Sequence, residues 1–179
     1  MLRNQRIPHG DVARLHPVTC AILIAPCDYE PRVQWSVAHE LAETYTADRI
    51  EPELHEAYCD RVAAALLMPR ERFIRSAKAC GLRLPQLRQV WPSCSREAIV
   101  SRIANLFPNT VASSWRGNRF KFRRTSDEYQ PPELATELEA FCAAEAAYHR
   151  RESWVREGNI GVRAWPAAGG RALALCVAA

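Results

Sequence analysis

A histidine and two glutamates lie within five residues of one another, at His39, Glu40 and Glu43. Residues four apart share one face of an α-helix, so His39 and Glu43 would project side by side. An imidazole nitrogen and a carboxylate oxygen at this spacing can hold one metal ion. Glu40 is rotated by about 100° from His39 around the helix. It can therefore reach a metal-bound water without binding the metal, as a general base must in metal-assisted hydrolysis.

A third metal ligand has to come from another element, and an acidic segment follows shortly downstream. Glu56 could complete the ligand set, and Asp60 lies one turn later on the same helix face. Asp60 could orient His39 through the second ring nitrogen of the imidazole. His39, Glu43, Glu56 and a water would fill the four positions of an open catalytic zinc site.

Two other side chains compete for the third position, and the spacing has a simpler explanation as well. His55 and Cys59 lie on a different face of the second helix, and we rank them below Glu56. A His-Glu-x-x-Glu segment also occurs on charged helices whose carboxylates are solvated. The corresponding alternative for His39 is a partly buried histidine that is bonded to a carbonyl group.

Prolines and glycines divide the chain into the elements that would position these side chains. Pro31 suits the first turn of one helix and Pro52 that of a second, which Pro69 ends. Apolar residues recur at helical spacing in both segments. The predicted elements are strands at 11–16 and 19–25, helices at 31–47, 52–68, 69–80, 84–90 and 95–107, a hairpin at 111–124, a helix at 131–151, and a last hairpin formed by 162–165 and 171–177.

Length and composition are those of an ordinary globular protein. The 179 residues are 48% hydrophobic and 25% charged, and the net charge is +4. No apolar run is long enough to span a bilayer, and no signal peptide is visible. The seven cysteines contain no CxxC pair, so a disulfide framework is not expected. We therefore expect a protein of the reducing cytoplasm.

Basic and aromatic residues alternate over 115–124, in the predicted hairpin. Such a surface could bind nucleic acid through phosphate contacts and base stacking. We favour the simpler interpretation, an edge strand protected by positive charge. The helices predicted between 84 and 107 could form a helix-turn-helix, but they lack a clear basic recognition face.

Two segments resemble the motifs of one known family, the IrrE/ImmA-like metallopeptidases. Pro31–Leu41, with the sequence PRVQWSVAHEL, is similar to the motif that leads into the family's HExxH helix. Glu56–Pro69, with the sequence EAYCDRVAAALLMP, is similar to the second motif, in which a ligand glutamate precedes an alanine-rich helix ending in Leu-Met-Pro. The resemblance is best over residues 19–107. It identifies His39 with the first zinc ligand of the family.

The resemblance implies further roles for three residues and a specific fold. Glu40 corresponds to the catalytic glutamate, Glu56 to the third ligand, and Glu43 stands in place of the second histidine. The implied fold is α+β: a small zincin-like domain at 1–107, followed by a C-terminal extension at 108–179 with hairpins and a long helix. The implied function is a gluzincin-type metallo-endopeptidase that cleaves a protein partner, such as a helix-turn-helix repressor in a stress response.

The substitution at Glu43 changes the charge of the expected site. Two histidines and one glutamate leave a zinc site with a charge of +1, whereas His39 with two glutamates leaves it neutral. A neutral site acidifies its bound water less, and the extra oxygen ligand favours manganese or iron over zinc. We therefore expect a weakened peptidase. The alternatives are an inactive regulatory module on the same fold and a DNA-associated regulator.

Overall fold

The structure of the chain is a computed structural model that describes residues 12–16, 20–27, 29–46, 50–117, 119–126 and 129–178. Over these ranges the fold is α+β, with six helices and two antiparallel sheets, which confirms the predicted class. The chain divides into two compact units, Met1–Phe73 with Val90–Ser95, and Ile74–Gln89 with Arg96–Ala179. The sequence analysis placed a single boundary between 107 and 108.

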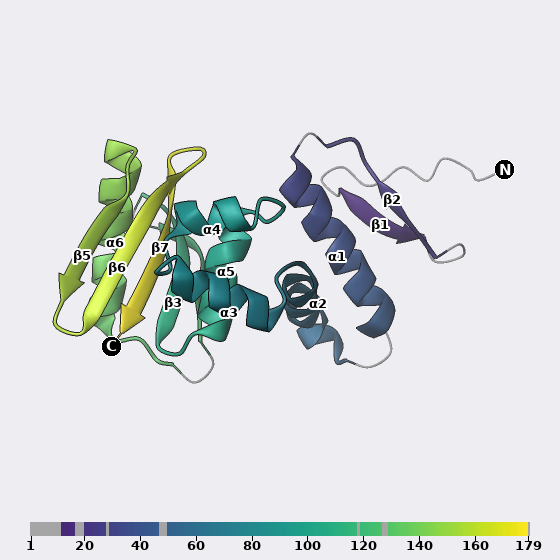
Figure 1. The fold of residues 1–179 in the computed structure, drawn as a ribbon, viewed down its shortest axis with the longest axis horizontal. Helices are drawn as coiled ribbons and strands as arrows, with labels where there is room; N and C mark the ends of the chain where they lie inside the picture. Colours follow the sequence, from purple (N-terminus) through teal and green to yellow (C-terminus); the bar gives the residue numbers. More distant parts are fainter. Residues whose placement is uncertain are drawn as a thin grey trace. The chain divides into compact units, whose positions relative to one another are not determined.

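The first unit consists of a β-hairpin that packs on the first of two helices, and the two helices pack against each other (Figure 1). Short side chains lie where the helices meet: Ala42 and Ala63 are fully buried, which lets the two backbones approach closely. The strands pair from Ala13 opposite Ile24 to His16 opposite Ala21. The elements of this unit are β1 (Ala13–His16), β2 (Ala21–Ile24), α1 (Glu30–Thr46) and α2 (Pro52–Leu67).

The second unit is built on one antiparallel sheet with the strand order β4-β3-β7-β6-β5. The boundary between the units, at Phe73 and Ile74, falls within helix α3 (Arg70–Ala79). None of the helices in the described residues is long and apolar enough to cross a membrane. The other elements are α4 (Leu84–Val90), α5 (Arg96–Leu106), β3 (Thr110–Arg116), β4 (Arg119–Thr125), α6 (Glu133–His149), β5 (Ser153–Glu157), β6 (Ile160–Ala167) and β7 (Arg171–Ala178).

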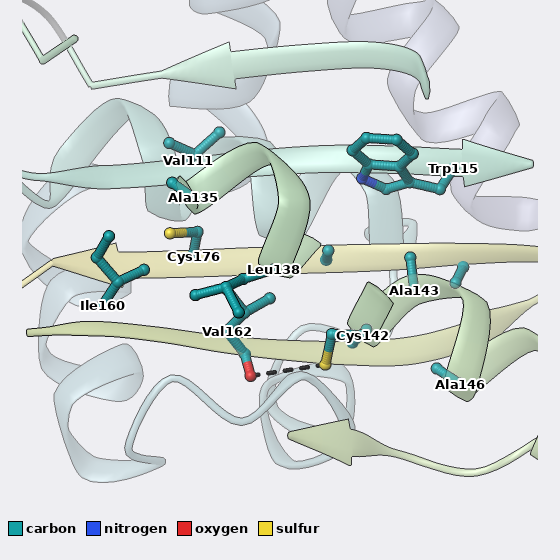
Figure 2. Close-up of a cluster of buried hydrophobic side chains, with 13 residues drawn as sticks. Val111, Trp115, Ala135, Leu138, Cys142, Ala143, Ala146, Ile160, Val162 and Cys176 are labelled. Carbon is teal, nitrogen blue, oxygen red and sulfur yellow. Dashed lines mark hydrogen bonds between the residues drawn. The ribbon is translucent and has the colours of Figure 1, made fainter. Parts of the chain in front are cut away.

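The alanine-rich helix α6 covers one face of this sheet (Figure 2). Its buried residues Leu138 and Cys142 contact strand side chains that include Val162 and Cys176. The Cys142 thiol donates a hydrogen bond to the Val162 carbonyl, at 3.7 Å. Successive side chains of a strand point to opposite faces, so Leu173 of β7 faces away from α6, on the side where α5 packs against β3, β4 and β7.

One acidic side chain is fully buried between α6 and the sheet. Glu139 has no exposed surface, and its two oxygens accept hydrogen bonds from Ser113 Oγ at 2.6 Å and from Arg123 Nη2 at 2.8 Å. The indole nitrogen of Trp115 donates to the same Ser113 Oγ at 2.8 Å. A buried charge needs such partners, because leaving it unpaired costs several kcal/mol. This network therefore determines which face of α6 meets β3 and β4.

Candidate metal centre

The structure brings the three expected ligands together from two neighbouring helices. His39 and Glu43 come from α1, and Glu56 comes from the first half of α2. His39 Nε2 lies 3.5 Å from Glu43 Oε1 and 3.4 Å from Glu56 Oε2. One nitrogen or oxygen of each side chain lies within 4.8 Å of those of the other two.

These separations suit a single small cation. Nitrogen and oxygen ligands that lie 2.0 to 2.1 Å from a tetrahedral zinc ion are about 3.3 Å from one another. Both distances from His39 Nε2 are within a few tenths of an ångström of this value. All three ligand atoms lie within 4.8 Å of one another, so side-chain rotation can bring the two carboxylates to this spacing. His39, Glu43 and Glu56 therefore fit a divalent metal, with a fourth position left for water.

The imidazole of His39 is oriented from its other side by α2. Its Nδ1 lies 3.3 Å from Asp60 Oδ1, which leaves Nε2 facing the two glutamates. A carboxylate on the remote nitrogen is the arrangement that orients metal-binding histidines and makes them better donors. Asp60 is where the sequence analysis expected it to be, one helical turn after Glu56.

Charge and burial shift two pKa values in this cluster. The hydrogen bond that His39 donates to Asp60 is the largest cause that raises the pKa of His39; burial opposes it, and the charges of Asp60, Glu56 and Glu43 add to it. Burial raises the pKa of Glu43, and the negative charges of Glu40 and Glu56 raise it further, while His39 lowers it. Several carboxylates thus lie close together around His39, and a divalent metal would offset the repulsion between their negative charges.

Glu40, the expected general base, has a partner outside the cluster. Its Oε2 accepts a hydrogen bond of 2.6 Å from the backbone amide of Leu15 in β1. Alternate residues of β1 direct their backbone groups away from the paired strand β2, and Glu40 satisfies one such outward amide. The bond therefore joins helix α1 to the hairpin. It uses one carboxylate oxygen of Glu40 and one backbone amide of β1 that is not paired with β2.

The cluster lies in an open hollow of about 390 Å³ in the first unit. Glu56 is on the solvent side, with 79% of its side chain exposed, whereas 16% of the His39 side chain is exposed. An exposed carboxylate has to be ordered when it binds an ion, so this ligand weakens the site. Trp35 and Arg32 also line the hollow, and the sequence analysis did not single out either of them.

The two rival ligands belong to a separate set of contacts. His55 Nε2 lies 2.9 Å from Thr46 Oγ1, and Cys59 Sγ lies 3.3 Å from the same oxygen. Cys59 is fully buried, so its thiol acts as a packing group at the end of α1. Both side chains are committed to Thr46, which supports the ranking of Glu56 above them.

Comparisons with known proteins give a likeness in structure. No protein-family model matches the chain, and no curated protein matches it in sequence. Among solved structures, a Mycobacterium tuberculosis transcriptional regulator superposes with a TM-score of 0.71 at 16% identity. The superposition covers 96% of this chain and 63% of that regulator, so the chain spans somewhat less than two thirds of its length. At this identity the likeness shows a shared fold.

This likeness corrects the functional expectation. A metallopeptidase that acts on a protein partner is contradicted, because the fold spanning nearly the whole chain is one found in a transcriptional regulator. The ligand geometry was a sound guide to which side chains meet, but a metal cluster is not by itself a catalytic centre.

Proposed function

We propose that this chain is a regulatory module that binds a divalent metal and acts by binding partners rather than by hydrolysis. The shared fold with a transcriptional regulator supports the regulatory role. The convergence of His39, Glu43 and Glu56 supports the metal. In this proposal the α1–α2 pair keeps the layout of a zincin-like site, while its ion serves as a signal or as a structural element.

The bond between Glu40 and Leu15 is the observation that carries the non-hydrolytic role. A general base has to receive a proton from metal-bound water, and here one carboxylate oxygen is held by a backbone amide at 2.6 Å. That amide is also the outer donor of β1 that an extended peptide would use to pair beside the site. The same hydrogen bond therefore occupies one oxygen of the expected base and makes the Leu15 amide unavailable to a peptide.

The donor set favours a cation that accepts oxygen ligands. One imidazole and two carboxylates neutralise a 2+ ion, and carboxylate-rich sites move preference from zinc towards manganese and iron. The ion would supply positive charge that draws Glu43 and Glu56 together. Because Glu43 lies on α1 and Glu56 on α2, binding would stiffen this helix pair. A protein or nucleic-acid partner would then bind either the metal-bound or the metal-free form of the first unit.

A metal titration of the chelator-treated full-length chain tests this proposal. Zn²⁺, Mn²⁺ and Fe²⁺ (the last without oxygen) are added separately, and binding is followed by calorimetry and by tryptophan fluorescence, to which Trp35 in the lining of the hollow contributes. We expect one saturable site that is lost in His39→Ala. The matched control is His149→Ala, because His149 and Glu145 form another histidine–glutamate pair four residues apart, at 3.5 Å. This control should bind normally.

A cleavage assay separates the regulatory from the enzymatic role. The metal-loaded chain is incubated with fluorescently labelled casein, and no hydrolysis above background is expected. Metal-dependent cleavage that disappears in Glu40→Gln would overturn the non-hydrolytic proposal. The absence of any His39-dependent metal binding would overturn the role of the cluster.

A further inference from the structure

The positive charge of the chain is concentrated in the β3–β4 hairpin. Residues 116–124 contain five basic side chains and no acidic one, while the chain as a whole has a net charge of +4. The other 170 residues, with 19 basic and 20 acidic side chains, therefore carry a net charge of −1. Of the five, Arg123 is neutralised by the buried Glu139. Arg116, Arg119 and Lys121, beside the turn of the hairpin, make this end of the second unit cationic.

Strand pairing aligns three arginines in a row across the sheet. Arg116 of β3 lies directly opposite Arg119 of β4 and, on its other side, opposite Arg171 of β7. Residues paired in this way point to the same face of the sheet, and like charges placed directly opposite are destabilising. Arg171 has an ion pair with Glu97 at 2.9 Å, whereas Arg116 and Arg119 have no hydrogen-bond or ion-pair partner within the described residues.

The row continues into a hollow at the same end of the sheet. Arg171 lines this hollow, of about 460 Å³, together with Arg96 and Arg150, and none of its lining residues is acidic. Two of these guanidinium groups are held by backbone carbonyls: Arg96 donates to Pro166 O at 3.2 Å and Arg171 to Ala168 O at 3.1 Å. Because these bonds fix the two guanidinium groups, their remaining N–H groups are already oriented for binding a ligand. Arg96 and Arg150 thus add positive charge beside the arginine row at this end of the sheet.

An exposed aromatic ring lies next to the arginine row on the edge strand. Phe120 follows Arg119, and 54% of it is exposed. Its ring is held edge-on against the buried Trp115, with centroids 5.6 Å apart and an interplanar angle of 73°. Arg119 and Phe120 point to opposite faces of the edge strand, so a ligand that crosses the arginine row and bends around this edge contacts both the cations and the ring.

Protection of the edge against aggregation explains only part of this arrangement. Charges on an edge strand do block pairing with another sheet. An exposed phenylalanine between those charges works against that purpose. Arginines placed directly opposite one another also cost stability that a single lysine would not. Cations in register beside a fixed aromatic ring are the features that bind a phosphate backbone and stack its bases.

We propose that a basic band, defined as Arg116, Arg119, Lys121 and Arg171 with Phe120 beside them, binds single-stranded nucleic acid. The arginines and Lys121 contact successive phosphates, and Phe120 stacks against a base. Binding is insensitive to sequence, because neither contact reads base edges. The three aligned arginines span about 10 Å across three strands, which is enough for more than one phosphate.

Fluorescence anisotropy with a labelled 12-nucleotide oligo(dT) tests the proposal, using metal-free full-length chain between 50 and 300 mM salt. Four phosphate contacts predict a slope of log K against log salt of about −3. The double variant Arg116→Gln/Arg119→Gln should reduce that slope by about 1.4. Phe120→Ala should weaken binding roughly tenfold and leave the slope unchanged. Removing the arginine row should also leave thermal stability equal or higher, since like-charge repulsion is relieved.

The opposite edge strand offers matched controls. Strand β5 carries an exposed arginine at Arg156 and an aromatic side chain, Trp154, that is 60% exposed. Arg156→Gln and Trp154→Ala should bind oligo(dT) as the wild type does. Equal losses in these controls, no binding at 50 mM salt, or binding to phosphatidylserine vesicles without binding to oligo(dT) would overturn the proposal. The assay contains no metal, so its outcome is independent of the metal proposal.

Discussion

Replacing Asp60 with asparagine separates orientation of the metal ligand from ligation itself. Asp60 does not face the ion position: its Oδ1 lies 3.3 Å from His39 Nδ1, whereas the expected ligand atom of His39 is Nε2. Asparagine has the same shape and can still accept a hydrogen bond from the ring through its amide oxygen. The substitution therefore removes the negative charge behind the imidazole and leaves all three ligands in place.

Loss of such a supporting carboxylate typically weakens metal binding by about 10- to 100-fold, or about 1.4 to 2.7 kcal/mol. The pH dependence of metal binding provides a second test. Asp60 is the largest cause that raises the pKa of His39, and the metal binds only the neutral ring. Asp60→Asn lowers this pKa, so protons compete less with the metal in the variant. The affinity deficit should be full at pH 8 and should narrow as the pH falls through the raised pKa of His39 in the wild type.

The assay is calorimetric titration of Zn²⁺ or Mn²⁺ into chelator-treated wild type and Asp60→Asn at pH 8.0 and 6.0. Glu53→Gln serves as the control, because Glu53 is an exposed carboxylate in the first turn of the same helix. This control should bind as the wild type does. The reasoning is wrong if Asp60→Asn binds within threefold of the wild type at pH 8, or if its deficit grows on acidification.

Three further predictions concern individual side chains. Glu43→His should tighten zinc binding and weaken manganese binding in competition titrations, since a neutral nitrogen ligand replaces a carboxylate whose pKa is raised by burial and neighbouring charge. Glu139→Gln should lower the free energy of unfolding in urea by about 3 kcal/mol, because Arg123 loses its buried counter-charge. Burial raises the pKa of Cys176 to about 12, so native-state alkylation at pH 8 should modify the exposed Cys20 and spare Cys176.

Each of these predictions has a clear contrary result. Unchanged zinc affinity in Glu43→His would mean that this side chain is not a ligand. The control for Glu139→Gln is Glu145→Gln, an exposed glutamate of the same helix that should change stability by less than about 0.5 kcal/mol. Equal losses in both variants would refute the role of the buried charge. Peptide mapping that finds Cys20 and Cys176 labelled at the same rate would contradict the burial argument.

Helices were predicted well because their signals are local. Prolines mark the starts of α1 and α2, and apolar residues recur at helical spacing, so all six predicted helices were found with ends displaced by at most two residues. The arrangement of His39, Glu43 and Asp60 followed from the same helical geometry. Glu56 could also be anticipated, because the two helices are adjacent in the chain and a short connection brings them side by side.

The sheet of the second unit could not be assembled from local patterns. Strand β5 was missed, and the two predicted hairpins proved to be parts of one sheet, because β7 pairs with β3 some 60 residues earlier in the chain. Such pairing depends on which faces bury against α6, and no short window of sequence contains that information. Glu139 was overlooked for the same reason. Its partners Ser113 and Arg123 lie in the hairpin, not in its own helix.

The small residues on the inner side of α6 have a consequence for how this unit can change. Ala135, Ala143 and Ala146 are almost completely buried, so the helix axis runs close to the strands. Any larger residue there would lift the helix and pull the Glu139 carboxylate out of reach of its two donors. The small size of these three residues and the hydrogen bonds of Glu139 therefore depend on each other, and a change in either one disrupts the other. Adaptation towards new partners is therefore directed away from this layer, to the strand edges and the turns, where side chains can be exchanged without moving the helix.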